Sequence, residues 1–356
     1  MCNGIVPPYL LRHLSQLDRD DLREAREAAE RALLSPFPPR PASPTAIPTS
    51  PPVAVAPSSP DRTISDAQGT ETLPGDLVRS EGDEPTGDIA ADEAYDGLGA
   101  TYELFAEVFD RASIDGAGMP LLATVHYGRL YDNAFWDGGQ MVFGDGDGQV
   151  FGRFTASLSV IGHELAHGVT QFSADLEYQG QSGALNESVS DVFGALVEQH
   201  SRGQSAAEAS WLIGEGLFTD QVEGNALRSM KAPGTAYDDD VLGKDPQPAT
   251  MDDYVDTADD NGGVHLNSGI PNHAFYLVAT ALGGNAWDAA GPIWYDTLTG
   301  GLASDATFAD FAAATAAAAV QRFGDGSTEH GAVLQAWSTV GLPIGDTGTD
   351  GTDTES

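Results

Sequence analysis

The pentapeptide His163-Glu164-Leu165-Ala166-His167 lies inside an apolar run, residues 156–172, whose periodicity predicts an α-helix. Histidines four positions apart project from one face of a helix, one turn apart, so their imidazoles can converge on one Zn2+ ion. Glu164, beside the first histidine, is then placed to take a proton from an attacking water. Such a helix must face an element that supplies a third ligand. The alternative interpretation is a structural helix with two histidines and a salt-bridging glutamate.

The candidate third ligand lies on a second predicted helix, residues 183–202. Glu187 and Asp191 are four positions apart on it. Glu187 can complete a His2Glu set with one position left open, and Asp191 can orient a ligand imidazole by accepting its other N–H. Two acids at this spacing also fit a solvated helix face. However, Leu185 and Val189 make the surroundings apolar, where an acid usually has a partner.

Composition divides the chain into five parts. Residues 1–35 are helix-forming, and residues 36–60 hold ten prolines among 25 positions, which predicts an extended linker. Strand signals dominate residues 61–155, and helical periodicity dominates residues 156–342. Strands first and helices second predict an α+β fold with two lobes. The end, residues 343–356, is acidic and lacks large apolar residues, so we predict a disordered tail.

Individual elements follow from the same patterns. One helix is predicted over residues 9–34, and a hairpin within residues 62–88. Further strands are predicted at 121–128 and 140–148, where Asp-Gly pairs mark turns. The remaining helices are predicted at 90–112, 267–282, 285–299, 305–323 and 329–339.

The charge balance excludes some classes of partner. Asp and Glu number 54 against 16 Lys and Arg, which gives a formal net charge of -38. This charge argues against binding to nucleic-acid backbones or anionic membranes, and we expect a monomer. The apolar stretch at the N-terminus is broken by Pro7 and lacks a basic region before it, so no standard secretory signal is evident. We expect secretion by another route, with a cytoplasmic location as the alternative.

Two more stretches complete a resemblance. They are Tyr131-Asp132-Asn133-Ala134-Phe135-Trp136 and the segment from Asp260 to Gly269, DNGGVHLNSG. Together with HELAH and GALNESVSD, in this order over residues 62–341, they resemble the thermolysin family of zinc metalloendopeptidases. The resemblance implies a two-lobed zincin fold with a cleft between a strand-rich N-terminal lobe and a helical C-terminal lobe. It also implies a peptide or protein substrate.

The resemblance implies roles for individual residues. Zinc would be bound by His163, His167 and Glu187, with Glu164 as the general base. The oxyanion would be stabilised by His265, oriented by Asp260, and by Tyr178. An extended peptide would be held by Asn133, Ala134 and Arg228. The primed-side pocket would be lined by apolar residues, namely Phe151, Phe154, Val160, Ile213 and Leu227. Such a pocket implies cleavage on the amino side of a large hydrophobic residue, although the same side chains could simply form core.

The N-terminus resembles a narrower group. Val6-Pro7-Pro8-Tyr9-Leu10 is similar to the short propeptides of protealysin-like precursors, which implies that residues 1–35 are a propeptide and that the chain is a zymogen. We expect the Val6 to Leu11 segment to lie across the cleft. The thiolate of Cys2, the one cysteine, would then be a candidate fourth zinc ligand. The alternative is that Cys2 has no role.

Calcium binding is expected to be weaker than the family pattern implies. Glu198 and Glu215 remain at positions of the double calcium site, but Ser159, Ser210 and Leu212 replace other ligands. Two carboxylates cannot easily satisfy two Ca2+ ions that each require six to eight oxygens. We therefore expect the double site to be absent or reduced, and we interpret GDGDG at 144–148 as a tight turn.

Two other functional classes remain open. One is a catalytically silent or permanently propeptide-inhibited zinc protein that acts as an interaction module. The joint presence of Glu164, His265, Tyr178 and Arg228 argues against it. The other is a zinc aminopeptidase, which needs an acidic anchor for the free amine of its substrate. No residue can be assigned to that anchor.

Overall fold

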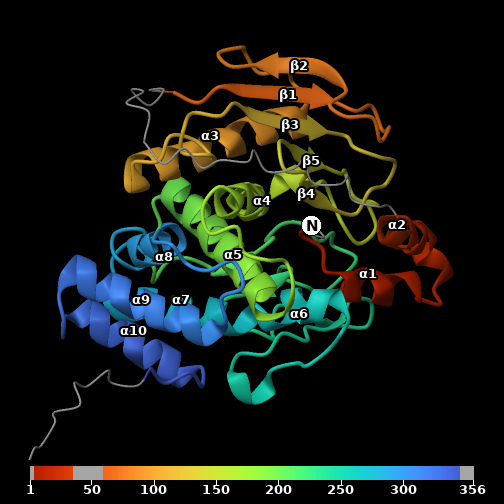
Figure 1. Ribbon diagram of the computed structural model, residues 1–356. Helices are drawn as coiled ribbons and strands as arrows, with labels where there is room; N and C mark the ends of the chain where they lie inside the picture. The colour runs from red at the N-terminus through yellow and green to blue at the C-terminus, as the bar shows by residue number, and fades with distance from the viewer. Residues whose placement is uncertain (1–3, 35–58, 345–356) are drawn as a thin grey trace, which may run out of the picture.

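The computed structural model describes residues 4–34 and 59–344 of the 356-residue chain. The predictions for Cys2, for most of the proline-rich linker and for most of the acidic tail lie outside these residues. The described chain forms a strand-containing lobe and a helical lobe, as the sequence predicts (Figure 1). No helix among the described residues is long and apolar enough to cross a membrane.

A five-stranded sheet forms the first lobe. Its strands are β1 (Arg62–Asp66), β2 (Asp76–Ser80), β3 (Leu121–Val125), β4 (Ala134–Trp136) and β5 (Met141–Phe143). The order across the sheet is β2-β1-β3-β5-β4, with β1, β3 and β5 parallel and the two edge strands antiparallel to their neighbours. The helix α3 (Ile89–Phe109) connects β2 to β3. Asp88 is its N-cap, and the Asp88 side chain accepts a hydrogen bond from the backbone N–H of Ala91. The edge strand β4 faces the second lobe.

Two buried helices join the lobes. α4 (Leu158–Gln171) and α5 (Gly180–Arg202) lie between the sheet and the C-terminal helices (Figure 1). Their backbones approach closely because Gly194 lacks a side chain: a Cβ there would lie 2.4 Å from the Ser159 carbonyl oxygen. This close approach brings the histidines of α4 opposite the acids of α5.

The remaining helices complete the second lobe. They are α6 (Asp260–Asn267), α7 (Gly269–Leu282), α8 (Ala290–Thr299), α9 (Phe308–Phe323) and α10 (Thr328–Thr339). Trp294 and Trp337 stack at the centre of α7 to α10, both fully buried. Between α5 and α6 the chain forms two short ribbons, β6 (Leu212–Ile213) with β7 (Arg228–Ser229), and β8 (Asp238–Asp239) with β9 (Gly243–Lys244).

The N-terminal segment differs from the prediction of one helix over residues 9–34. It forms α1 (Pro8–Ser15) and α2 (Arg23–Leu34), separated by a 3-10 turn at Asp20–Leu22. Arg19, between α1 and this turn, is extended, with φ -134° and ψ 113°, so the helical path is interrupted there. The break lets both helices bury an apolar face, Leu10 and Leu14 on α1 and alanines on α2. Tertiary packing therefore outweighs the local helical preference.

Candidate active site

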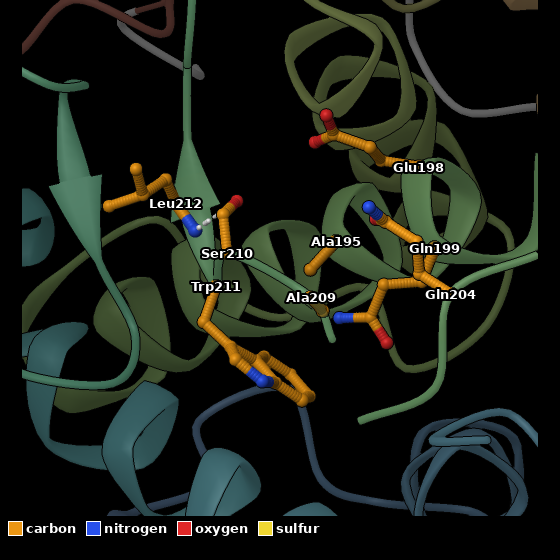
Figure 2. A pocket seen from close by; sticks show the side chains of 8 residues that line it. All are labelled: Ala195, Glu198, Gln199, Gln204, Ala209, Ser210, Trp211 and Leu212. Atoms are coloured by element: carbon orange, nitrogen blue, oxygen red, sulfur yellow. Dashed lines mark hydrogen bonds between the residues drawn. The ribbon is translucent and has the colours of Figure 1, made fainter. Parts of the chain in front are cut away.

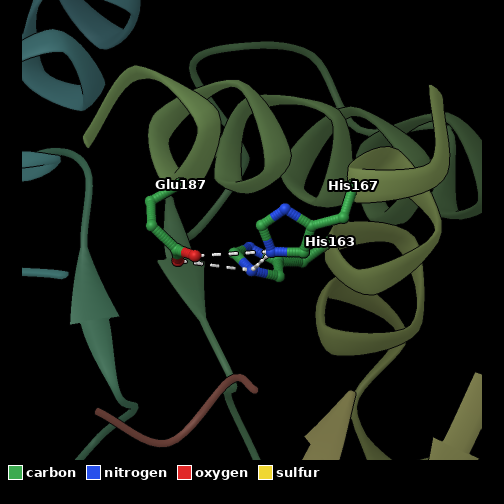
Figure 3. A group of neighbouring side chains, drawn as sticks. All are labelled: His163, His167 and Glu187. Atoms are coloured by element: carbon green, nitrogen blue, oxygen red, sulfur yellow. Dashed lines mark hydrogen bonds and ion pairs between the residues drawn. The ribbon is translucent and has the colours of Figure 1, made fainter. Parts of the chain in front are cut away.

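Three buried donors come together where α4 faces α5 (Figure 3). His163 and His167 extend from α4 and Glu187 from α5, and one ligand atom from each lies within 4.8 Å of the other two. The two Nε2 atoms are 3.0 Å apart. The Glu187 carboxylate oxygens lie 3.5 Å from Nε2 of His163 and 3.4 Å from Nε2 of His167. Within residues 4–34 and 59–344, this is the one group of three or more His, Cys, Asp or Glu side chains arranged to hold a metal.

Each imidazole is oriented through its other nitrogen. Nδ1 of His163 lies 2.7 Å from Asp191 Oδ1, and Nδ1 of His167 lies 2.8 Å from Asn186 Oδ1. Both oxygens accept an N–H, so each Nε2 presents a lone pair toward Glu187. Oε2 of Glu187 is buried and accepts no hydrogen bond from the described residues. A buried, unsatisfied carboxylate oxygen beside two imidazole lone pairs fits a tetrahedral cation such as Zn2+.

The protonation states agree with metal binding. Burial lowers the pKa of His163 and of His167 to about 4, although Asp191 and Glu187 respectively oppose this shift. Both imidazoles are therefore neutral at physiological pH. Metal ligation requires the neutral ring.

Glu164 lies on α4 beside the first histidine and is fully buried. Its Oε2 accepts a hydrogen bond from the backbone N–H of Trp136, at 3.0 Å, and its Oε1 has no hydrogen-bond partner among the described residues. Burial raises the pKa of Glu164 well above its usual value, and the charge of Glu187 adds to the effect. A cation at the His-His-Glu group would act in the opposite direction. The carboxylate is thus held at one oxygen and available at the other.

His265 follows a run of four residues with positive φ, Asp260 to Gly263. Gly262 and Gly263 make this turn accessible, with φ of 86° and 73°. The turn brings Oδ2 of Asp260 to 2.9 Å from the His265 backbone nitrogen, and Oδ1 to 2.7 Å from its Nδ1. Burial alone would lower the pKa of His265, but Asp260 and Glu187 raise it to about 9, so the ring is protonated at neutral pH.

Tyr178 completes this side of the centre. Its hydroxyl donates a hydrogen bond to Oε1 of Glu187 and lies 3.3 Å from Nε2 of His265. Tyr178 and His265 therefore lie together beside the His-His-Glu group. Their role as oxyanion donors stays a prediction.

The N-terminal segment occupies the space in front of these groups. The Ile5 N–H donates to the Ala134 carbonyl oxygen at 3.0 Å, which adds a short stretch of chain to the edge strand β4. The Val6 N–H donates to Oδ1 of Asn133 at 2.9 Å. Nη1 of Arg228 donates to the Ile5 carbonyl oxygen at 3.1 Å, and Nε2 of His265 donates to the Gly4 carbonyl oxygen at 3.2 Å. Residues 4–6, rather than the expected Val6 to Leu11, make the backbone contacts in the centre.

Comparisons with known proteins agree with this geometry. Residues 59–171 match the thermolysin metallopeptidase catalytic domain, and residues 174–342 match the thermolysin metallopeptidase alpha-helical domain. The chain belongs to the thermolysin family. It is a zinc metalloendopeptidase by this membership, and its α+β two-lobed fold is confirmed. The two matched regions meet near the end of α4, whereas the sequence analysis placed the boundary between the lobes at residue 155, which stays a prediction.

Several relatives narrow the family assignment. The chain is 56% identical to an extracellular metalloprotease of Pectobacterium carotovorum subsp. carotovorum over 80% of this chain and 82% of the relative. It is 40% identical to a thermolysin of Alicyclobacillus acidocaldarius subsp. acidocaldarius over 78% of this chain and 50% of the relative. The solved precursor of protealysin from Serratia proteamaculans superposes with a TM-score of 0.86 at 52% identity, covering 95% of this chain and 99% of that chain. The protealysin-like subgroup is thereby confirmed.

The apolar residues expected in the specificity pocket are all buried in this thermolysin-family chain. Phe151 and Phe154 pack with ring centroids 5.7 Å apart, and the Leu227 N–H donates to the Ile213 carbonyl oxygen across the β6-β7 ribbon. Val160 lies on α4, one turn before His163. The Ile5 side chain is fully buried as well. Their assignment to a pocket stays a prediction.

Sequence reasoning missed several contacts that orient the centre. Asn186 and Ser190 both hold Nδ1 of His167, and Asn272 donates from α7 to Oδ2 of Asp191. Asn186 and Ser190 are four positions apart on α5, the same spacing as Glu187 and Asp191, so a helical projection would have shown two polar pairs side by side. The backbone N–H of Trp136, which holds Glu164, has no signature in the side-chain sequence.

The expected calcium positions are occupied differently. Figure 2 shows Glu198 and Ser210 at a hollow that also includes Gln199 and Leu212. Nη1 of Arg202 lies 2.6 Å from Oε1 of Glu198, so a guanidinium already contacts this carboxylate. Glu198 is the one carboxylate that lines this hollow, and Glu215 lies near enough to raise the pKa of Glu198. The reduced double calcium site stays a prediction.

Proposed function

We propose that this zinc metalloendopeptidase is made in a latent form and, once residues 1–34 have been removed, cuts internal peptide bonds on the amino side of large hydrophobic residues. The observation that carries the proposal is the backbone of Gly4 to Val6. It runs along β4 and uses Ala134, Asn133 and Arg228, the residues expected to hold a substrate. A segment bound in this way excludes any other peptide from the same contacts.

The residues of the centre suit peptide hydrolysis. Zinc bound by His163, His167 and Glu187 supplies a strong nucleophile from water at neutral pH and polarises the carbonyl under attack. Oε1 of Glu164, the carboxylate oxygen without a partner, takes the proton of the attacking water. Nε2–H of His265 and the Tyr178 hydroxyl donate to the carbonyl oxygen as negative charge develops on it. Asp260 fixes the ring of His265 for this role.

The docked segment also supports the specificity. Its residue immediately after the carbonyl that faces His265 is Ile5, an apolar side chain that is fully buried. A substrate in the same register would bury its own side chain at this position. Burying one large aliphatic or aromatic side chain contributes about 1.5–3 kcal/mol, enough to select such residues.

Export and oligomeric state belong to the same proposal. The relative from Pectobacterium is named an extracellular metalloprotease, which supports secretion of this chain. We further propose that the chain acts as a monomer.

The docked segment fits a second function as well. A chain whose N-terminal helices never leave would be a permanently inhibited zinc protein that acts through its surface. The two functions differ in what happens once the docked segment is separated from the catalytic lobes.

The experiment uses full-length protein with a specific protease site inserted between residues 45 and 46, loaded with zinc. Peptide mapping of a digested unfolded protein is performed before and after the site is cut and the released segment separated. We expect one zinc per chain, little hydrolysis before the cut, and afterwards internal fragments that begin with large hydrophobic residues. Glu164→Gln should keep its zinc and lower kcat by about 10²–10⁴-fold. Persistent latency after separation would favour the permanently inhibited protein, and terminal trimming alone would favour an aminopeptidase.

A further inference from the structure

The contacts of residues 4–6 define a register on the active site. The Ile5 N–H pairs with the Ala134 carbonyl, the Ile5 carbonyl with Arg228, and the Val6 N–H with Asn133, at 3.0, 3.1 and 2.9 Å. Each backbone group of Ile5 is therefore paired with the catalytic lobes. These contacts determine which peptide bond of the segment lies beside the proposed catalytic groups.

That bond joins Gly4 to Ile5. The Gly4 carbonyl oxygen accepts a hydrogen bond from Nε2 of His265 at 3.2 Å, and the Tyr178 hydroxyl lies 3.3 Å from the same nitrogen. The Gly4 carbonyl thus contacts one of the two proposed oxyanion donors, His265, and the other, Tyr178, lies beside that histidine. A segment that blocked the cleft without entering it as a substrate would not need this arrangement.

We propose that the Gly4–Ile5 bond is a cleavage site of the chain's own active site, so that the latent protein removes the residues before Ile5. The inference rests on the proposed function, because the same groups act. A water oxygen adds to the Gly4 carbonyl carbon and Oε1 of Glu164 takes the water proton. The C–N bond then breaks as the proton held by Glu164 passes to the Ile5 nitrogen, and the second water proton, lost from the new Gly4 carboxyl group, completes the ammonium of Ile5 and leaves Gly4 as a carboxylate.

Gly4 has a conformation that only glycine adopts readily. Its φ is 75°, and a Cβ at this position would lie 2.6 Å from both the Ala134 carbonyl oxygen and Oδ1 of Asn133. The missing side chain lets the Gly4 carbonyl approach the centre while the Ile5 side chain is buried. The register of the bond therefore depends on glycine at position 4.

The cut leaves the blocking segment in place. The contacts of the Ile5 carbonyl and of Val6 lie after the broken bond, and α1 follows directly with Leu10, Leu11 and Leu14 buried. α2 adds a further contact, because Oε1 of Gln149 accepts the Ala25 N–H at 3.0 Å. The product that begins at Ile5 stays bound and inhibits. This reaction is therefore a maturation of the N-terminus that does not activate the enzyme.

The test follows the N-terminus of the full-length chain by intact mass and N-terminal sequencing after zinc is added. We expect a new terminus at Ile5 that forms at a rate independent of protein concentration, as an intramolecular reaction requires. Glu164→Gln should keep the original terminus. Arg12→Ala removes an exposed contact between α1 and Asp259, 3.6 Å long, and should form the new terminus as fast as wild type. Peptide hydrolysis should remain latent throughout.

Several outcomes would overturn the inference. A zinc-loaded chain that keeps Gly4 for days, yet hydrolyses peptides after the blocking segment is separated, would refute self-cleavage and leave the proposed function intact. If neither reaction occurred, the proposed function itself would fail. A rate that rises with protein concentration would refute the intramolecular reaction, and full activity on formation of the Ile5 terminus would refute the continued binding of the product.

Discussion

Helix α5 carries two buried glutamates, Glu187 and Glu198, that differ in what surrounds them. Glu187 faces two neutral imidazoles, and its Oε2 has no hydrogen-bond partner among the described residues. Glu198 contacts the guanidinium of Arg202, one turn further along the same helix. Burial raises the pKa of Glu198, Arg202 lowers it and Glu215 raises it.

The comparison indicates which surroundings make a buried carboxylate suitable as a metal ligand. Burial is similar for the two residues, at 1% and 5% exposed. The protonated ring of His265 lies 3.5 Å from Oε2 of Glu187 but makes no hydrogen bond with it, and two neutral imidazoles converge on the same carboxylate. A cation can therefore bind between the three donors. Glu198 instead contacts the guanidinium of Arg202, and it belongs to no group of three metal donors among the described residues.

The same substitution at both positions gives the largest expected contrast. Glu187→Gln removes an anionic ligand, so we expect zinc affinity to fall by more than the roughly 10–100-fold that loss of an outer partner causes, with activity lost in parallel. Glu198→Gln should keep one zinc per chain and activity within about twofold, because Glu198 contacts Arg202 and is not part of the His-His-Glu group. Zinc analysis after dialysis and peptide hydrolysis after separation of the N-terminal segment measure both. Equal zinc loss in the two variants would contradict the distinction.

Substituting a residue that orients a zinc ligand tests the comparison with a smaller expected effect. Asp191→Asn replaces the acceptor of His163 Nδ1–H by an amide, and we expect zinc affinity to fall by about 10–100-fold in competition with a chelator. Asp260→Asn is the matched control, because Asp260 orients His265, which does not ligate zinc. It should lower kcat while zinc affinity stays at the wild-type value. Weaker zinc binding in Asp260→Asn would show that Asp260 also affects zinc affinity, which would contradict the separate roles of Asp191 and Asp260.

A third prediction concerns Arg202, whose guanidinium contacts Glu198. Arg202→Gln leaves Glu198 without its partner, and we expect the free energy of unfolding to fall by less than about 1 kcal/mol, because Arg202 is half exposed and screened by solvent. Wild-type protein should show the same Tm with and without millimolar Ca2+. A Tm that rises with Ca2+ in the wild type would instead indicate a functional calcium site. Thermal unfolding of both proteins in chelator and in Ca2+ measures the effect.

The smallest effect is expected from His126 in the first lobe, far from both glutamates in sequence. Burial alone would lower the pKa of His126, but Asp145 and Asp88, at 2.9 and 3.1 Å, raise it above its usual value of 6.5. A raised pKa in the folded state stabilises the protein fully below pH 6.5, and this contribution is lost as the pH rises through the folded value. The free energy of unfolding of His126→Gln should therefore lack this decrease above pH 6.5. If the pH dependence of the free energy of unfolding is unchanged in His126→Gln, the contacts of His126 with Asp145 and Asp88 do not stabilise the fold.

The zinc centre was predictable because its signals are local. His163 and His167 are one helical turn apart, as are Glu187 and Asp191, and helices preserve such spacing whatever their tertiary setting. The two-lobed architecture followed in the same way from where strand and helix patterns lie. The relation of Arg202 to Glu198 is also local, but a sequence pattern does not distinguish an exposed ion pair from one that neutralises a buried acid.

Features that depend on docking were not predictable. The break between α1 and α2 lets the two helices fold back against each other, and this packing outweighs the continuous helical pattern. The register of Gly4 to Val6 depends on the position of β4 and Arg228, more than a hundred residues away. The hydrogen bond from the Trp136 backbone to Glu164 comes from tertiary proximity alone.

Asp191 connects the zinc ligands with the residue that holds the N-terminal segment. Its carboxylate accepts from His163, a metal ligand, and from Arg228, which holds the Ile5 carbonyl. Zinc and an extended peptide therefore bias the same anionic group, and thermodynamic reciprocity follows: whatever factor the bound peptide contributes to zinc affinity, zinc contributes to peptide affinity. The effect of zinc on the affinity for the N-terminal segment and the effect of the segment on zinc affinity therefore measure the same coupling free energy.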